Sequence, residues 1–88
     1  MKVSVIITCY NLEPYISRAI NSCLNQTMNE DDYEVIVVDD MSTDKSWSVI
    51  ERFGSLVVPI RMKENLGVSA ASNAGIREAS GKYVVRVD

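Results

Sequence analysis

Residues 33–44 read YEVIVVDDMSTD, an apolar run that stops abruptly at a polar cluster. The run from Glu34 to Val38 is short and rich in β-branched residues, which is typical of a strand buried on both faces of a sheet. Ser42, Thr43 and Asp44 then offer side chains that can cap the first turn of a helix. This step from a buried strand to a helix predicts an α/β protein with a parallel sheet.

Similar strand patterns lie on both sides of this segment, at Val3 to Thr8, Leu56 to Met62 and Tyr83 to Val87. Pro59 has no N–H group to donate to a neighbouring strand, so we expect the third strand at an edge of the sheet. Apolar stripes at helical spacing separate the strands and are formed by Ile16, Ala19, Ile20, Cys23 and Leu24, by Val49, Ile50 and Phe53, and by Val68, Ala71, Ala74, Gly75 and Ala79. This alternation predicts an open sandwich with right-handed crossovers.

The composition narrows the class of protein and of partner. The 88 residues are 47% hydrophobic and 24% charged, as in globular domains. The formal net charge is -3 and the Lys and Arg residues are scattered, so we expect no nucleic-acid partner. No apolar run approaches the ~20 residues that cross a bilayer, and no signal-peptide pattern follows Met1. We expect a cytoplasmic protein, which in a full-length form could lie at the cytoplasmic face of the membrane.

The chain contains no histidine and only two cysteines, Cys9 and Cys23, without a CxxC spacing. These facts exclude Cys/His zinc sites and His-based catalytic triads. Both cysteines stand in apolar surroundings, so we interpret them as small core residues. Any acid, base or metal ligand must therefore be a carboxylate, a lysine, a tyrosine or a cysteine.

Polar clusters follow each predicted strand, and they are residues 8–11 (TCYN), Asp39-Asp40, residues 63–65 (KEN) and Asp88. The carboxyl ends of parallel strands meet at one edge of a sheet, and ligands of open α/β sheets bind in the crevice beyond that edge. The four clusters together predict a binding site there.

Each cluster also has a purely structural explanation. Asp39 and Asp40 point to opposite faces, so at most one carboxylate can face the crevice while the other supports the loop, or both simply precede a helix cap. Tyr10 could stack on a base and Asn11 could make polar contacts, or the two could be turn residues. The small residues of segment 65–75 could bring a helix N-terminus to a phosphate, or they could only allow tight packing.

Several segments in sequence order resemble the opening of family 2 glycosyltransferases, over essentially all 88 residues: VSVIITCYN (3–11), LNQT (24–27), YEVIVVDDMSTDKS (33–46), ENLGVSAASNAGI (64–76) and ASGKYVVRVD (79–88). The resemblance implies the N-terminal half of a GT-A fold, a Rossmann-like three-layer sandwich with about four parallel strands in the order 3-2-1-4. It also implies a nucleoside-diphosphate sugar donor, often a UDP-sugar, with Mg²⁺ or Mn²⁺, and transfer with inversion.

The resemblance assigns roles residue by residue. Thr8 and Tyr10 would line the base pocket, Asp40 would hydrogen-bond the base and Asp39 would support it. The family's segment beside the nucleotide is matched by Asn65, Gly67 and Asn73, and the first Asp of its DxD metal motif is matched by Asp88. Ser72 departs from the pattern, since many relatives have Arg there, which puts a cationic contact to the donor in doubt.

The resemblance further implies that residues 1–88 are a truncated GT-A domain whose second DxD aspartate, general base and acceptor site lie beyond Asp88. We therefore expect no catalytic residue and no transfer in this chain alone, and a saccharide or lipid-linked acceptor for the full-length protein. Strand 83–87 is expected to be an exposed edge that allows self-association.

Two other functions are open. The chain could be a nucleotide-binding or structural Rossmann-like module without catalysis. It could also be a different Rossmann-like enzyme, although neither GxGxxG nor a Walker A sequence follows any strand.

Overall fold

The computed structural model describes residues 2–25 and 29–87. Strands and helices alternate along the chain as β1 (Val3–Cys9), α1 (Ile16–Leu24), β2 (Tyr33–Asp39), α2 (Ser46–Glu51), β3 (Val58–Arg61), α3 (Val68–Glu78) and β4 (Tyr83–Val87). Two single-turn 3-10 helices, η1 (Glu30–Asp32) and η2 (Gly54–Leu56), precede β2 and β3. No helix in these two ranges is long and apolar enough to cross a membrane.

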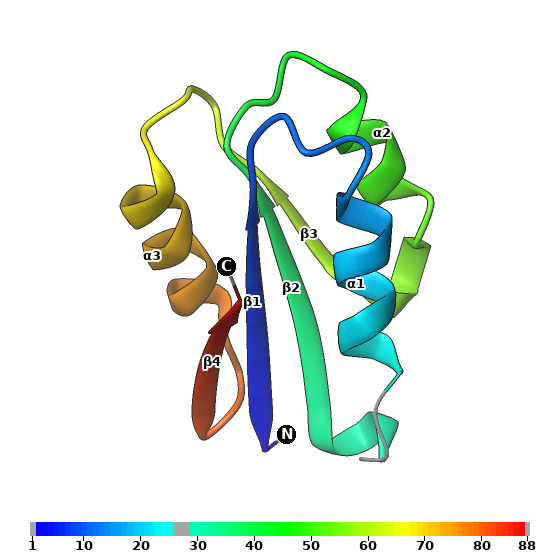
Figure 1. Cartoon of the computed structure of the whole chain (residues 1–88). Coiled ribbons are helices and arrows are strands. Elements are labelled where there is room, and N and C mark those ends of the chain that lie inside the picture. The colour runs from blue at the N-terminus through cyan, green and yellow to red at the C-terminus, as the bar shows by residue number, and fades with distance from the viewer. Residues whose placement is uncertain (1, 26–28, 88) are drawn as a thin grey trace.

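The four strands form one parallel sheet in the order β3-β2-β1-β4, which confirms the predicted topology. Helices α1 and α2 cover one face of the sheet and α3 covers the other, so the molecule has three layers (Figure 1). The loops that follow β1, β2 and β3 gather at one end, at the top of Figure 1. This end is the carboxyl edge of the sheet.

Side chains of β1 and β2 alternate between two apolar cores, because successive strand residues point to opposite faces. Val5, Ile7, Val35 and Val37 pack toward α1 and α2, while the residues between them pack toward α3. Both cysteines are buried in the first core, as predicted. The central strands are thus held from both sides, which fixes the register of the loops at their ends.

Helix α3 lies close to the sheet because its inner face carries small residues. A Cβ atom at Gly75 would approach Ile6 Cγ2 to 2.8 Å and Val38 Cγ2 to 3.2 Å. The helix can therefore pack this closely only because residue 75 has no side chain. This packing places α3 against β1 and β2.

Two local predictions were partly wrong. The third strand begins at Val58, because Leu56 belongs to η2 and its side chain is exposed, although β3 is the edge strand that Pro59 predicted. Ser42 and Thr43 do not cap α2, which begins at Ser46 without a side-chain bond from the N-cap Lys45. Only Asp44 takes a helix amide, with Oδ1 accepting from the Ser46 N–H at 2.9 Å.

Candidate functional site

The carboxyl edge joins three strand ends through backbone hydrogen bonds. The Asp40 N–H donates to the Cys9 carbonyl at 2.8 Å, and the Met62 N–H donates to the Asp39 carbonyl at 2.8 Å. Segments that are far apart in the sequence therefore meet, as the polar clusters predicted. The contacts below involve the clusters after β1, β2 and β3.

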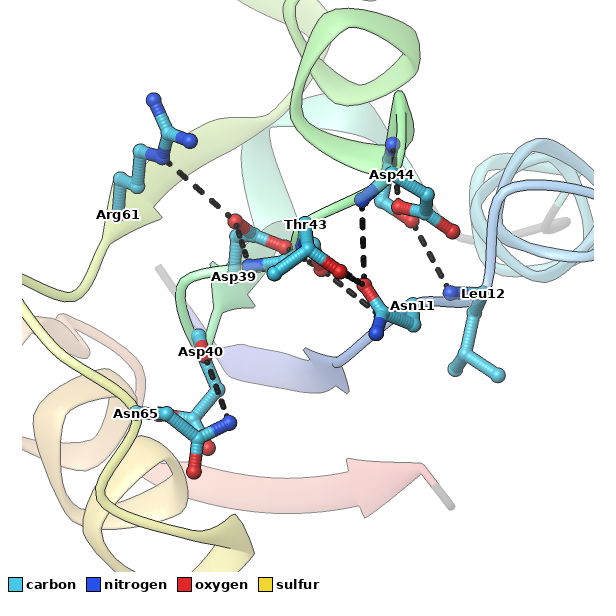
Figure 2. Close-up of polar contacts among 10 residues, drawn as sticks. Asn11, Leu12, Asp39, Asp40, Thr43, Asp44, Arg61 and Asn65 are labelled. Carbon is cyan, nitrogen blue, oxygen red and sulfur yellow. Dashed lines mark hydrogen bonds and ion pairs between the residues drawn. The ribbon is translucent and has the colours of Figure 1, made fainter.

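Asp39 holds the loop after β2 together. Its carboxylate is fully buried and accepts from the Ser42 N–H at 3.1 Å and from the Ser42 hydroxyl at 2.5 Å. Arg61 Nε lies 3.7 Å from the Asp39 carboxylate (Figure 2). The Arg61 guanidinium also stands over the Trp47 ring, 5.6 Å from its centre. Asp39 thus acts on the side of α1 and α2, in a supporting position.

Asp40 lies on the opposite face, at the start of α3. Its carboxylate accepts from the Leu66 N–H at 3.0 Å and from the Gly67 N–H at 2.9 Å, and its carbonyl accepts from Asn65 Nδ2 at 3.2 Å. Gly67 is the N-cap of α3 and has a φ of 96°, which glycine adopts without a steric penalty. Asp40 therefore accepts hydrogen bonds from two backbone N–H groups just before α3. They belong to segment 65–75, for which phosphate binding was one of the two explanations.

Asn11 fastens the loop after β1 to the loop after β2 (Figure 2). Its side-chain oxygen accepts from the Thr43 N–H at 2.8 Å, and from the Thr43 hydroxyl and the Asp44 N–H at 3.3 Å each. Its own N–H donates to the Ser42 hydroxyl at 2.9 Å. The predicted polar residue thus makes its contacts within the protein. It fixes the shape of the carboxyl edge formed by residues 8–11, 39–44 and 62–67, which we call the rim.

Asp44 adds a further link between the two loops. The hydrogen bond with Ser46 is the main cause that lowers the pKa of the Asp44 carboxyl, and the Glu13 N–H donates to the second carboxylate oxygen at 3.2 Å. The Ser46 hydroxyl in turn accepts from the Leu12 N–H at 3.0 Å. Burial raises the pKa of the Cys9 thiol beside them, so this cysteine stays a neutral thiol at pH 7.

Three predicted site residues make no contact of this kind with the rim. Tyr10 is 46% exposed at the end of β1. Thr8 is half-buried on the face that Ile6 presents to α3. Asn73 is exposed on α3, about opposite the sheet-facing stripe of Ala71, Ser72, Ala74 and Gly75, since each helical residue turns by about 100°.

Asp88, the predicted metal ligand, lies outside the described residues. Within residues 2–25 and 29–87, no three Cys, Asp or Glu side chains come together in a way that could hold a metal ion. The described residues therefore do not form a metal site by themselves.

Sequence reasoning missed the role of two side chains. Ser42 bridges Asp39 and Asn11, and an aspartate that accepts from an N–H group a few residues later is a common loop motif that could have indicated it. Arg61 pairs with Asp39 because the two residues are opposite each other in the register of β2 and β3. The sequence alone does not give this register, so it could not indicate the pair.

A cavity of about 430 Å³ lies at the other end of the sheet, lined by side chains that include Leu24, Tyr33 and Val57. None of the predicted site residues lines it. The polar groups of the rim and this cavity thus lie at opposite ends of the sheet, and we assign the candidate site to the rim because three separate segments converge on it.

The chain is similar to known proteins in both sequence and structure. A model of the family described as Glycosyl transferase family 2 matches residues 4–88. The poly(ribitol-phosphate) beta-glucosyltransferase of Bacillus spizizenii is 40% identical over 92 residues, an alignment that covers 100% of this chain and 14% of that protein.

Two solved structures are also similar. Residues 1-349 of TarS from S. aureus in complex with UDP-GlcNAc superpose with a TM-score of 0.92 at 34% identity, covering 100% of this chain and 26% of that one. A mannosyltransferase from Pyrobaculum calidifontis in complex with GDP-Man and Mn2+ gives 0.88 at 32% identity, covering 94% and 26%. The chain thus spans about a quarter or less of the length of these proteins.

Proposed function

This chain belongs to glycosyl transferase family 2, and we propose that it supplies the donor-binding part of an enzyme that transfers a sugar from a nucleoside diphosphate, with UDP as the nucleotide. The observation that carries the proposal is the rim itself. The ends of β1 and β2 and the start of α3 are joined by hydrogen bonds, and Tyr10 is exposed beside them.

In this proposal the rim recognises the nucleoside. Tyr10 stacks on the base, since an exposed ring next to a rigid loop presents a flat apolar face at little entropic cost. Asp40 accepts a hydrogen bond from the base, because each carboxylate oxygen keeps a second lone pair after binding one backbone N–H. Thr8 on the neighbouring strand lines the same face.

The first turn of α3 faces the diphosphate in this proposal. The first helical hydrogen bond runs from the Ala71 N–H to the Gly67 carbonyl, so the N–H groups of residues 68–70 have no partner within the helix. Free N–H groups and the helix dipole favour an anion. Asn65, Gly67 and Asn73 belong to this segment, and only the first two lie next to Asp40.

A divalent cation, Mg²⁺ or Mn²⁺, is part of the proposal for the whole enzyme, with Asp88 as one ligand. Support comes from the mannosyltransferase solved with GDP-Man and Mn2+. When bound, such an ion would neutralise charge on the diphosphate leaving group. We propose transfer with inversion to a saccharide or lipid-linked acceptor, in line with the similarity to a poly(ribitol-phosphate) glucosyltransferase.

Nucleotide binding can be tested on the 88-residue chain by thermal shift and calorimetry with UDP, GDP and ADP, each with and without Mn²⁺. UDP at 100 times its dissociation constant should stabilise the fold by about 2.7 kcal/mol. Tyr10→Ala should abolish most of this stabilisation. Tyr15→Ala, which removes a ring that is 63% exposed just before α1, is the matched control and should keep it. No stabilisation of the natural sequence by UDP would overturn the proposal.

A non-catalytic module is the second candidate. One observation favours such a module. The carboxylates of Asp39, Asp40 and Asp44 already accept hydrogen bonds from backbone N–H groups, as expected in a structural scaffold. We expect the 88 residues alone to bind the donor without transferring its sugar, since relatives that carry the name of transferases are several times longer. Sugar transfer by this chain above a blank would contradict that expectation.

Self-association is proposed through β4. This strand is an edge of the described sheet, and Tyr83, Val84 and Val85 are between 41% and 64% exposed on its two faces. Unpaired apolar edges favour pairing with another strand. A sedimentation coefficient that does not change with concentration would rule the proposal out.

A further inference from the structure

Two residues other than glycine have a positive φ in the described part of the chain, and both lie at the rim. Asn11 has a φ of 52° and Met41 a φ of 62°. A side chain disfavours this left-handed region, in which asparagine is tolerated and glycine is at ease. Such outliers persist only where something else requires them.

The conformation of Asn11 is explained by the fold. Its side-chain oxygen accepts three hydrogen bonds from Thr43 and Asp44, and these require the loop to turn as it does. The backbone of Met41 is also held from both sides, by the Asp40 N–H on the Cys9 carbonyl and by the Ser42 N–H on the Asp39 carboxylate, but these bonds do not involve the Met41 side chain. Its side chain is apolar and 37% exposed, while its neighbours Asp40 and Ser42 are buried. Glycine would adopt this φ more easily, so the fold alone does not call for methionine here.

The position of Met41 brings it beside Tyr10. The Asp40 N–H donates to the Cys9 carbonyl, and the Asn11 N–H donates to the Ser42 hydroxyl. Tyr10 and Met41 therefore lie between two hydrogen bonds that join the ends of β1 and β2. Each residue is flanked by anchored neighbours, and each leaves its own side chain partly exposed. An aromatic residue and a thioether, each partly exposed, therefore follow the ends of the adjacent strands β1 and β2.

We propose that Met41 is a specificity-determining residue that contacts the nucleobase of the donor beside Tyr10, and that methionine rather than glycine stands at this left-handed position because of this contact. This inference rests on the proposed function. The sulfur of methionine is polarisable and packs well against the faces and edges of aromatic rings. Its flexible side chain can follow a base, whereas Asp40 supplies the directional hydrogen bond.

Substitution of Met41 by glycine should change the stability of the fold and its affinity for UDP in opposite directions. Met41→Gly removes both the thioether and the Cβ that disfavours a φ of 62°. Without ligand, its melting temperature should rise by about 4 °C, the shift expected when modest strain is removed from a chain of this size. Its dissociation constant for UDP should rise about fivefold, as expected for the loss of a sulfur–aromatic contact. Met41→Ala should lose the same affinity without the gain in melting temperature.

The experiment measures melting temperature and UDP affinity of the 88-residue chain for the natural sequence, Met41→Gly, Met41→Ala and the control Leu56→Ala. Leu56 is an apolar residue of η2 that is 61% exposed and lies outside the rim. The control should bind UDP as the natural sequence does. Pyrophosphate, which has no base, should bind all four proteins equally.

The outcomes are distinct. If the natural sequence does not bind UDP, the proposed function fails and this inference fails with it. If it binds UDP and Met41→Gly binds equally tightly, only the inference is overturned. A Met41→Gly protein that melts below the natural sequence, or that weakens for pyrophosphate as much as for UDP, also overturns it, since Met41 would then serve the fold or the phosphates.

Discussion

The amino and carboxyl ends of the β1–β2 pair both carry polar groups, but the groups are arranged differently. At the amino end, the Ser4 hydroxyl donates to Glu34 Oε2 at 2.6 Å, and the same oxygen accepts from the Ser80 N–H at 2.7 Å. The Gly81 N–H donates to the Ser4 hydroxyl at 2.8 Å. We call these four residues the amino-end latch, because they hold the turn before β4 against the first residues of β1 and β2.

The carboxyl rim is just as well satisfied by hydrogen bonds, but it differs in strain and exposure. Both non-glycine residues with a positive φ among the described residues lie there, and Tyr10 and Met41 project from it. In the latch, Ser4 is fully buried, Glu34 and Gly81 are half-buried and Ser80 is exposed. Hydrogen bonding among polar groups therefore does not distinguish the two ends, whereas the positive φ and the exposed apolar side chain of Met41 do.

The largest expected effect comes from Asp39, whose buried carboxylate binds Ser42 twice and pairs with Arg61. Asp39→Ala leaves two buried donors of Ser42 without an acceptor, and each unmade bond of this kind costs about 1–3 kcal/mol. Urea unfolding should show a loss of about 3 kcal/mol. Asp31→Ala, at an exposed carboxylate of η1, is the control and should change little. A loss as small as the control's would mean that the rim is not held by Asp39.

The next effect tests the close contact in the latch. A Cβ at Gly81 would lie 2.7 Å from the Ser4 nitrogen and 2.7 Å from the Val3 carbonyl carbon, and backbone atoms cannot move aside cheaply. Gly81→Ala should therefore cost about 2 kcal/mol in urea unfolding.

Gly54→Ala is the matched control for the latch. This glycine has a φ of 56°, and a Cβ added to it would meet no atom within 4 Å, so only backbone strain of about 1 kcal/mol is expected. Equal losses for the two variants would show that the latch is looser than the distances indicate.

Two serine variants sharpen the comparison directly. Ser4→Ala and Ser42→Ala each remove a buried hydroxyl that accepts from a backbone N–H, and each should cost about 1 kcal/mol of stability. Only Ser42→Ala should also weaken UDP binding, because Ser42 joins the two loops that carry Tyr10 and Met41. Calorimetry with UDP on both variants checks this, and a loss of affinity in Ser4→Ala would erase the functional difference between the two ends.

The smallest expected effect is on the decline of stability at acid pH. The pKa of Asp44 is lowered from its usual 3.8, mainly by the hydrogen bond with Ser46, so the folded protein binds this proton less readily than the unfolded chain. The stabilisation is present above pH 3.8 and is lost as the pH falls through the lower folded value. Asp44→Asn should thus show a flatter decline of the unfolding midpoint at acid pH. An unchanged profile would mean that Asp44 does not contribute.

Much of the fold was predictable because it depends on repeating patterns. The β-branched runs predicted β1 and β2 on a buried parallel sheet, and Pro59 predicted that β3 is an edge strand. The start of β3 was misplaced, since an apolar run such as residues 56–62 does not reveal where a short 3-10 turn ends. The location of the rim was predictable, because the polar clusters follow the strands. The binding roles of its residues are still predictions.

The sequence by itself determined the order of elements, the two-sided burial of the central strands and the edge at which polar residues gather, because hydrophobic periodicity and turn chemistry are local. Only the tertiary structure decided that Asp39 pairs with Ser42 and Arg61, that Asp40 binds the amides before α3, and that Met41 is held in a left-handed conformation. The physical reason is that hydrogen bonds and backbone strain depend on distances between segments. Packing of helices on the sheet, through contacts such as Gly75 against Ile6, sets those distances.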